Sequence, residues 1–193
     1  MGRVIAWGDN SYGQCDVPDG LIATQVAAGS NHALAIRPDG SVVAWGHESY
    51  GECDVPDGLI ATQVAAGYQH SLAIRPDGSV VAWGRNHFRQ CVVPGGLIAT
   101  QVAAGWHISF ALSADGSVVA WGEYQGYTST PYILPDGLTA MQLAPNEDVS
   151  NNVLASNGTV ISWNCSSHTR VDFFPPDLIA TQVAGGGYHA LVI

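Results

Sequence analysis

Residues 39–46 read Asp-Gly-Ser-Val-Val-Ala-Trp-Gly, and this pattern returns along the whole chain. Its tryptophan ends a short apolar run. Four such tryptophans are 38 residues apart, and a fifth follows after 42: Trp7, Trp45, Trp83, Trp121 and Trp163. A second motif, Leu-Ile-Ala-Thr-Gln-Val-Ala, begins at Leu21, Leu59, Leu97 and Leu178, with a degraded copy at Leu138. A fixed period of this length indicates a repeat architecture.

One repeat unit is predicted to form four short strands, which we name A to D. In the first complete unit they cover 24–28, 32–36, 41–45 and a segment near 52–55. Arg37-Pro38-Asp39-Gly40 separates B from C and is a tight-turn sequence, with proline presetting φ and glycine supplying a positive φ. Short strands at even spacing, separated by Gly and Pro, predict an all-β array.

The apolar pattern favours a propeller over a solenoid or a sandwich. Strands B and C are apolar on both faces, as in sheets stacked between two neighbours. Strand A is rich in Ala and Gly, which suits crowding around a central axis. Strand D ends in Pro18 or Pro56, which an outer edge tolerates. We therefore expect a five-bladed β-propeller with four antiparallel strands in each blade.

The two ends of the chain are expected to complete one blade together. Residues 2–7 already match strand C, and residues 190–193 match strand B. We expect a composite blade from 178–193 plus 2–18, so that the N-terminal strands pair with the C-terminal strands. The chain 1–193 is then a single domain of five repeats of about 38–41 residues, with no room for a signal peptide.

Three segments resemble the regulator of chromosome condensation repeat. They are Trp-Gly-Asp-Asn-Ser-Tyr-Gly-Gln at 7–14, Val-Ala-Ala-Gly-x-x-His-x-Leu-Ala at 26–35 and Asp-Gly-Ser-Val-Val-Ala-Trp-Gly at 39–46. The repeat length and the Val-Pro ending are most similar to bacterial members, such as the propeller-type β-lactamase inhibitory protein. The resemblance implies a propeller whose loop face binds a protein. Known relatives mostly have seven blades, and this chain departs from them with five.

Charge and composition exclude several classes of function. The chain has 16 acidic and 6 basic residues, giving a formal net charge of −10. Such a protein repels phosphate, so we expect no nucleic-acid partner. The apolar runs are too short to span a bilayer, and we expect no membrane partner. All basic residues are arginine, which excludes lysine Schiff-base chemistry and a P-loop lysine.

Comparison of two repeats locates the variable positions. Segments 21–58 and 59–96 are identical at 27 of 38 positions. Most differences fall in two places: 30–31 against 68–69, and 47–52 against 85–90. The first lies in the A–B connection and the second in the C–D connection. Because successive strands run antiparallel, both connections emerge on the same face, and this pattern is typical of a scaffold that carries a recognition surface.

The variable face is also rich in aromatic residues, which are favoured anchors of protein interfaces. The predicted partner-binding residues are Tyr12, Tyr50, Tyr68, Phe88, Trp106, Tyr124, Tyr127, Tyr188, Glu48, Arg85 and Arg89. The alternative is that these loop aromatics pack on their own blades. The five repeated tryptophans are instead predicted to pack between blades as structural core.

Cysteine and histidine positions do not predict a metal site. Cys15, Cys53 and Cys91 match one another in three blades, too far apart for disulfides, and Cys165 is out of register. We therefore expect four free thiols, which favours the cytoplasm. The recurring histidines, His32, His70 and His189, are predicted to hydrogen-bond the start of strand B. No zinc-ligand spacing is present, so we expect neither a metal nor another cofactor.

The sequence favours a non-enzymatic protein-binding scaffold. No nucleophile elbow or phosphate-binding glycine loop is present. The partner is a protein, with inhibitor-like binding of an enzyme as one specific version, and the scaffold is expected to be a monomer. One alternative is a lectin with a shallow sugar site in each blade, although the non-equivalent loops favour one asymmetric partner. A second alternative is an exchange factor for a small GTPase. The repeat 138–177 diverges most, and both a specialised contact patch and a decayed blade remain open.

Overall fold

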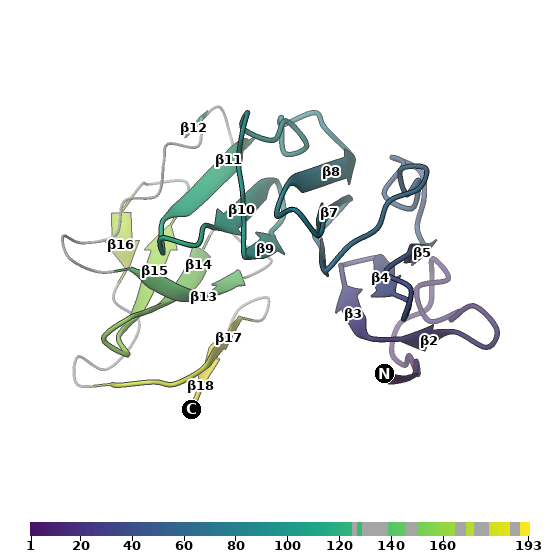
Figure 1. Cartoon of the computed structure of the whole chain (residues 1–193), viewed down its shortest axis with the longest axis horizontal. Coiled ribbons are helices and arrows are strands. Elements are labelled where there is room, and N and C mark those ends of the chain that lie inside the picture. Colours follow the sequence, from purple (N-terminus) through teal and green to yellow (C-terminus); the bar gives the residue numbers. More distant parts are fainter. Residues whose placement is uncertain (125–126, 129–138, 146–149, 165–168, 172–177, 186–189) are drawn as a thin grey trace.

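The computed structural model contains β-strands and no helix among the residues it describes, which are 1–124, 127–128, 139–145, 150–164, 169–171, 178–185 and 190–193. No helix in this part of the chain is therefore long and apolar enough to cross a membrane. The strands form small antiparallel sheets that follow one another along an arc (Figure 1). This order is that of successive propeller blades.

Two central blades have three strands each. The first has the order β3-β4-β5, at Gln25–Ala28, His32–Ile36 and Val42–Gly46. The second has the order β6-β7-β8, at Gln63–Ala66, His70–Ile74 and Val80–Gly84. These bounds agree with the predicted strands A, B and C to within one residue.

The next two blades have four strands. One contains β9, β10, β11 and β12, at Gln101–Ala104, Ile108–Leu112, Val118–Tyr124 and Tyr127–Thr128. The other contains β13, β14, β15 and β16, at Ala140–Pro145, Ser150–Ala155, Val160–Asn164 and Thr169–Val171. The second of these lies in the divergent repeat, which therefore keeps the blade architecture.

The B–C turn forms as predicted. The Arg37 amide donates to the Ser41 carbonyl at 2.9 Å, and the Gly40 amide donates to the Arg37 carbonyl at 2.9 Å. Gly40 adopts a φ of 85°, which its missing side chain permits. The Asp39 carboxylate accepts from the Ser41 amide at 2.9 Å and closes the turn.

The predicted fourth strand near 52–55 is wrong for the two central blades. The chain makes consecutive tight turns there instead, because the Asp54 amide donates to Gly51 at 3.0 Å and the Val55 amide donates to Cys53 at 2.9 Å. Amides used within turns cannot pair with the edge of β5. Four strands in every blade is therefore not what the structure has.

The core lies between consecutive sheets. One cluster joins Leu34 and Ile36 of one blade to Val64 and Trp83 of the next. Another joins Leu72 and other residues of that second blade to the blade after it. Strand β7 is buried along its whole length, on both faces. Stacked sheets explain why strands B and C are apolar on both faces.

The two ends of the chain form separate two-stranded sheets. At the N-terminal end β1 (Gly2–Arg3) pairs with β2 (Ile22–Ala23). At the C-terminal end β17 (Val183–Gly185) pairs with β18 (Ala190–Val192). The arc is open between these two sheets in Figure 1, and no hydrogen bond joins them among the described residues. The composite blade stays a prediction.

Candidate functional site

The A–B and C–D connections lie together on one face. The His47 amide donates to the Asn31 carbonyl at 2.8 Å, and the Arg85 amide donates to the Gln69 carbonyl at 2.8 Å. Each bond ties a C–D loop to the A–B turn of its own blade. We call the surface formed by the C–D loops 9–16, 47–54 and 85–92 and the A–B turns 29–31, 67–69 and 105–107 the loop rim.

Aromatic and histidine rings form a line across the first part of the loop rim. The Tyr12 ring meets the His47 ring edge-on, with centroids 4.9 Å apart. His47 lies 6.0 Å from Tyr50, which in turn meets His87 edge-on at 6.3 Å. Each of these contacts is between rings of one C–D loop or of adjacent C–D loops. The rings therefore link three successive C–D loops.

A second group of rings joins the third C–D loop to the A–B turns. Phe88 lies 4.1 Å from His107, and His107 stacks on Trp106 at 5.4 Å. Tyr68 of the preceding turn meets Trp106 edge-on at 5.5 Å. The Arg85 guanidinium lies 5.0 Å from the Tyr50 ring and 5.4 Å from the Phe88 ring, and so connects the two groups.

The three C–D loops share one internal framework. In each, a Gln or Glu side chain accepts a hydrogen bond from the amide two residues earlier at 2.9 Å, and the three residues are Gln14, Glu52 and Gln90. The main-chain carbonyl of the same residue accepts from the tryptophan indole of the next blade at 2.8–3.0 Å. Trp45, Trp83 and Trp121 thus fasten each loop to the following blade.

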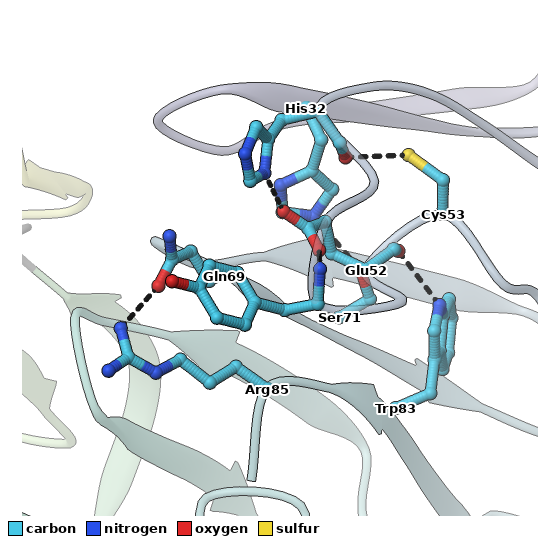
Figure 2. Close-up of polar contacts among 9 residues, drawn as sticks. His32, Glu52, Cys53, Gln69, Ser71, Trp83 and Arg85 are labelled. Atoms are coloured by element: carbon cyan, nitrogen blue, oxygen red, sulfur yellow. Dashed lines mark hydrogen bonds and ion pairs between the residues drawn. The ribbon is translucent and has the colours of Figure 1, made fainter. Parts of the chain in front are cut away.

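Only one of these framework residues is charged. Glu52 is completely buried, and its carboxylate pairs with the His47 ring. In the next loop Arg85 takes the position of His47 and Gln90 that of Glu52. Arg85 turns away and donates from Nη1 to the Gln69 side-chain oxygen, as Figure 2 shows.

Two buried histidines bridge the blades. His32 Nε2 lies 2.9 Å from Ser71 Oγ, and His70 Nε2 lies 3.0 Å from Ser109 Oγ. Burial lowers the pKa of His32 to about 4 and that of His70 to about 3, so both rings are neutral at pH 7. Their partners lie near the start of strand B, in the blade that follows. His189 lies outside the described residues.

The serine–histidine pairs resemble those of hydrolases but lack access to a substrate. Ser71 and Ser109 are completely buried. Each hydroxyl donates to a main-chain carbonyl, at 2.9 Å for Ser71 and 2.8 Å for Ser109. A hydroxyl committed in this way, with no path to solvent, is a structural bridge.

A cavity of about 430 Å³ lies along the inner strands, and A-strand residues of five successive repeats line it. Its wall is mostly Ala, Val and Gly backbone, and Tyr68 and Trp106 of the loop rim border it. The Ala- and Gly-rich composition of strand A is explained by this crowding.

The predicted partner-binding residues have different positions. Tyr12, Tyr50 and Trp106 are exposed, Tyr68, Phe88 and Arg85 are half-buried, and Glu48 and Arg89 are exposed. Tyr124 and Tyr127 are backbone partners between β11 and β12. Tyr188 lies outside the described residues. Among the repeated tryptophans, Trp83 and Trp121 are buried and Trp45 is half-buried, but Trp7 is 86% exposed because no strand lies beside it.

Sequence reasoning missed a set of contacts that we call the glutamine clamp. Four A-strand glutamines hydrogen-bond the backbone of the next A strand: Gln25 to Val64, Gln63 to Val102, Gln101 to Leu143 and Gln142 to Val183. A polar residue repeated within an otherwise apolar strand was the available signal. The partners of His47 and His87 were missed as well.

The cysteines follow the expected pattern where they are described. Cys15, Cys53 and Cys91 are free thiols, and Cys165 lies outside the described residues. Burial raises the pKa of Cys53 to about 11 and that of Cys91 to about 12, so both are protonated at neutral pH. In the described part of the chain no group of three or more His, Cys, Asp or Glu residues could hold a metal ion.

Repeated small sheets, stacked through their faces around inner strands, define a β-propeller built from sequence repeats. Residues 23–52, 61–90 and 99–123 match the family described as Regulator of chromosome condensation (RCC1) repeat. The match of these three repeats confirms the resemblance seen in the sequence. Closeness to its bacterial members stays a prediction. Among curated proteins none matches the sequence.

Solved structures share the fold. Human WBSCR16 is 19% identical over 96% of this chain and 66% of its own, with a TM-score of 0.73. Yeast RCC1 (Prp20), solved with Kap60, is 20% identical over 88% of this chain and 53% of its own, with a TM-score of 0.70. The ectodomain of the Arabidopsis thaliana receptor kinase ACR4 is 18% identical over 87% of this chain and 66% of its own, with a TM-score of 0.69. The chain spans between about half and two thirds of the length of these proteins.

Proposed function

We propose that the chain is a non-enzymatic scaffold that binds one protein partner through the loop rim, with an enzyme as the partner class that the family resemblance implies. The observation that carries this proposal is the series of contacts from Tyr12 to Trp106, in which the Arg85 guanidinium joins two groups of rings and which spans four successive repeats. Exposed aromatic residues held in place by one another lose little conformational freedom on binding. The three loops differ in sequence, which favours a single asymmetric partner.

The comparisons support a protein as the ligand. Yeast Prp20, which shares the fold, was solved bound to Kap60, and its binding to Gsp1p and histones is described. At 20–22% identity the shared feature is the fold, so none of these three partners transfers to this chain. We infer from the comparison only that a propeller of this repeat type can bind a protein.

The test is a capture experiment with a matched control. The triple variant Tyr50→Ala, Phe88→Ala and Trp106→Ala removes three rings of the loop rim, and Arg37→Ala with Arg75→Ala alters the B–C turns. Proteins captured from a lysate of the source organism by the immobilised chain are identified by mass spectrometry. We expect a partner that the Arg37→Ala, Arg75→Ala variant still captures and that the triple variant does not. The Tm of the triple variant should be nearly unchanged. A partner retained by both variants would contradict the proposal.

A lectin is tested separately on a glycan array. Multivalent sugar binding requires equivalent sites in successive blades, and the three described C–D loops are not equivalent. Several mono- or disaccharide hits that depend on Tyr50 or Trp106 would favour the lectin over the protein-binding scaffold.

We also propose that the scaffold is a monomeric ring of five blades, closed by the composite blade 178–193 plus 2–18. The glutamine clamp supports this. Four clamps join consecutive A strands, and a fifth, from Gln182 to Val26, would join the last A strand to the first. The four receiving residues are 2–5% exposed, whereas Val26 is 56% exposed. A closed ring would bury it.

Exposed apolar residues at the two ends support the same closure. The segment 4–8 matches 42–46, and 189–193 matches 32–36. Since Leu34 pairs with Ala44, Leu191 would pair with Ala6. Leu191 is 67% exposed, while its counterpart Leu34 is completely buried. Pairing the two ends would remove this apolar surface from water.

A disulfide tests closure directly. Residues opposite each other in an antiparallel pair lie within the Cα separation that a disulfide requires. We expect Ala6→Cys with Leu191→Cys to form an intramolecular disulfide on oxidation, identified by peptide mapping of the monomer. The control pair Asp19→Cys with Leu191→Cys should not form one. A cross-link found only in dimers would contradict closure within one chain.

A further inference from the structure

The third C–D loop reverses the charge of the other two. Loop 9–16 carries two acidic residues and loop 47–54 carries three, and neither contains Lys or Arg. Loop 85–92 carries Arg85 and Arg89 and no acidic residue. Among the other described arginines, Arg3, Arg37 and Arg75 lie at or beside the B–C edge, and Arg170 lies in β16 opposite Trp163. Among the three C–D loops of the loop rim, only the third therefore carries arginine.

Arg89 occupies a backbone conformation that disfavours it. Its φ is 61°, and it is the one non-glycine residue with a positive φ among those described. The equivalent residues of the other loops are Gly13 and Gly51, with φ of 79° and 78°. A side chain in this region costs free energy that glycine avoids. Strained residues of this kind concentrate at functional sites.

A neighbouring substitution makes room for Arg89. A Cβ on Gly51 would lie 2.9 Å from the Asp54 carboxylate, and one on Gly13 would lie 3.3 Å from that of Asp16. In the third loop Val92 takes the place of these aspartates. Val92 therefore removes a carboxylate that would crowd the Arg89 side chain and would also neutralise its charge. Two coupled differences thus leave Arg89 exposed and unpaired with any described carboxylate.

Arg85 is also held without a carboxylate. Its guanidinium lies beside the Tyr50 and Phe88 rings, and its Nη1 donates to the neutral Gln69 side chain. Its Nε is buried and has no hydrogen-bond partner. Within the described residues no Asp or Glu lies at ion-pair distance from it. A guanidinium with spare donors is suited to a carboxylate, which it binds through paired hydrogen bonds.

Resting on the proposed function, we propose that Arg85 and Arg89 receive an Asp or Glu side chain of the protein partner. Tyr50 and Phe88 would then cover the aliphatic part of that side chain. The overall charge of −10 disfavours an extended polyanion such as nucleic acid. Glu48 lies in the adjacent C–D loop, and Asp9 and Asp16 lie in the loop before that, so we expect neutral or basic residues of the partner to flank its acidic side chain.

The probe is a displayed library of random twelve-residue peptides, selected on the full chain and depleted on the triple variant Tyr50→Ala, Phe88→Ala and Trp106→Ala. We expect the enriched peptides to share an Asp or Glu at one position. Changing that residue to Asn or Gln in the synthetic peptide should weaken binding at least tenfold in fluorescence polarisation. Arg85→Gln should weaken the original peptide equally and the changed peptide no further.

Arg89→Gly separates binding from folding. Because glycine fits a φ of 61° better, this variant should keep or raise its Tm while its affinity for the peptide falls at least fivefold. Arg37→Gln, at the opposite edge, should leave affinity unchanged. The inference is overturned if no peptide is enriched, if enriched peptides lack a shared acid, or if Arg89→Gly binds as the wild type does. Enriched peptides without an acid would still leave the proposed function standing.

A last experiment tests an oligonucleotide as the ligand. A labelled single-stranded DNA of twenty nucleotides should not bind at physiological salt. Binding that Arg85→Gln abolishes would assign the site to phosphate and overturn the carboxylate proposal.

Discussion

Ser71 Oγ lies 2.9 Å from His32 Nε2 of the preceding blade and donates its own proton to the Glu52 carbonyl at 2.9 Å. Since the hydroxyl proton is committed, the histidine must donate from Nε2. This fixes the tautomer and leaves Nδ1 without a proton or a partner. Trp83 donates to the same Glu52 carbonyl at 3.0 Å (Figure 2). The Glu52 carbonyl of one C–D loop therefore accepts two hydrogen bonds from the next blade, and the Ser71 hydroxyl also contacts His32 of the preceding blade.

Removing the Ser71 hydroxyl should destabilise this junction. Ser71→Ala leaves the His32 ring donor buried without an acceptor, a loss worth about 1–3 kcal/mol. Urea unfolding should report the decrease in the free energy of unfolding. The control is Ser49→Ala, an exposed serine of the adjacent loop, which should change stability by less than about 0.5 kcal/mol. Equal effects of the two variants would show that the bridge contributes nothing.

The free energy of unfolding should decrease as the pH is lowered below 6.5. His32 and His70 have folded pKa values of about 4 and about 3, below the ordinary value of 6.5. Between these values the unfolded chain binds a proton that the folded chain does not, so stability decreases as pH falls. Each histidine should contribute a loss of about 2 kcal/mol by pH 5. The free energy of unfolding is measured for the wild type and for His70→Gln at pH 7.5 and at pH 5. The difference between the two pH values should be smaller for the variant. An unchanged dependence would contradict burial of a neutral ring.

The repeat sequence predicted the blades well because its signals are local. Each apolar run and the Arg37–Gly40 turn depend on residues close together in the chain, and the 38-residue period shows that the same local unit recurs. The failure of the fourth strand is also local in origin. The segment 53–55 was predicted as a strand from its composition. Its Asp54 and Val55 amides instead donate to the Gly51 and Cys53 carbonyls within turns, and composition does not show which carbonyl an amide will bind.

The interior contacts of the site depend on pairs that lie about 40 residues apart. The sequence placed Tyr50, Phe88 and Trp106 on one face through strand direction alone. It did not predict that Glu52 would be buried, because only the His47 side chain and the Tyr50 amide make burial of that carboxylate acceptable. The Ala33 to Ser71 difference between repeats was the signal for the histidine bridge, since it adds a hydroxyl to a buried strand.

Close approach of the A–B turns explains two glycines. A Cβ on Gly67 would lie 2.6 Å from the Gly105 carbonyl, and one on Gly29 would lie 2.4 Å from the Gly67 carbonyl. Backbone atoms of a packed blade cannot yield easily, so Gly67→Ala should lower the free energy of unfolding by about 2 kcal/mol or more. Gly95→Ala is the control, because its Cβ would meet open space. Similar Tm values for both variants would show that the turns are less tightly packed.

Substitutions in the glutamine clamp test both the contact between neighbouring blades and the closure of the ring. Gln101 donates to the Leu143 carbonyl at 3.2 Å and accepts from the Leu143 amide at 2.9 Å. Gln101→Met keeps the length of the side chain but leaves both backbone groups unpaired, so it should destabilise the protein by about 1–3 kcal/mol. Gln182→Met applies the same change at the position that would close the ring. In a five-bladed ring its cost should match that of Gln101→Met, whereas in an open arc it should be close to zero. Urea unfolding of both variants distinguishes the two arrangements, and a loss at Gln182 that appears only at high protein concentration would indicate pairing between copies instead.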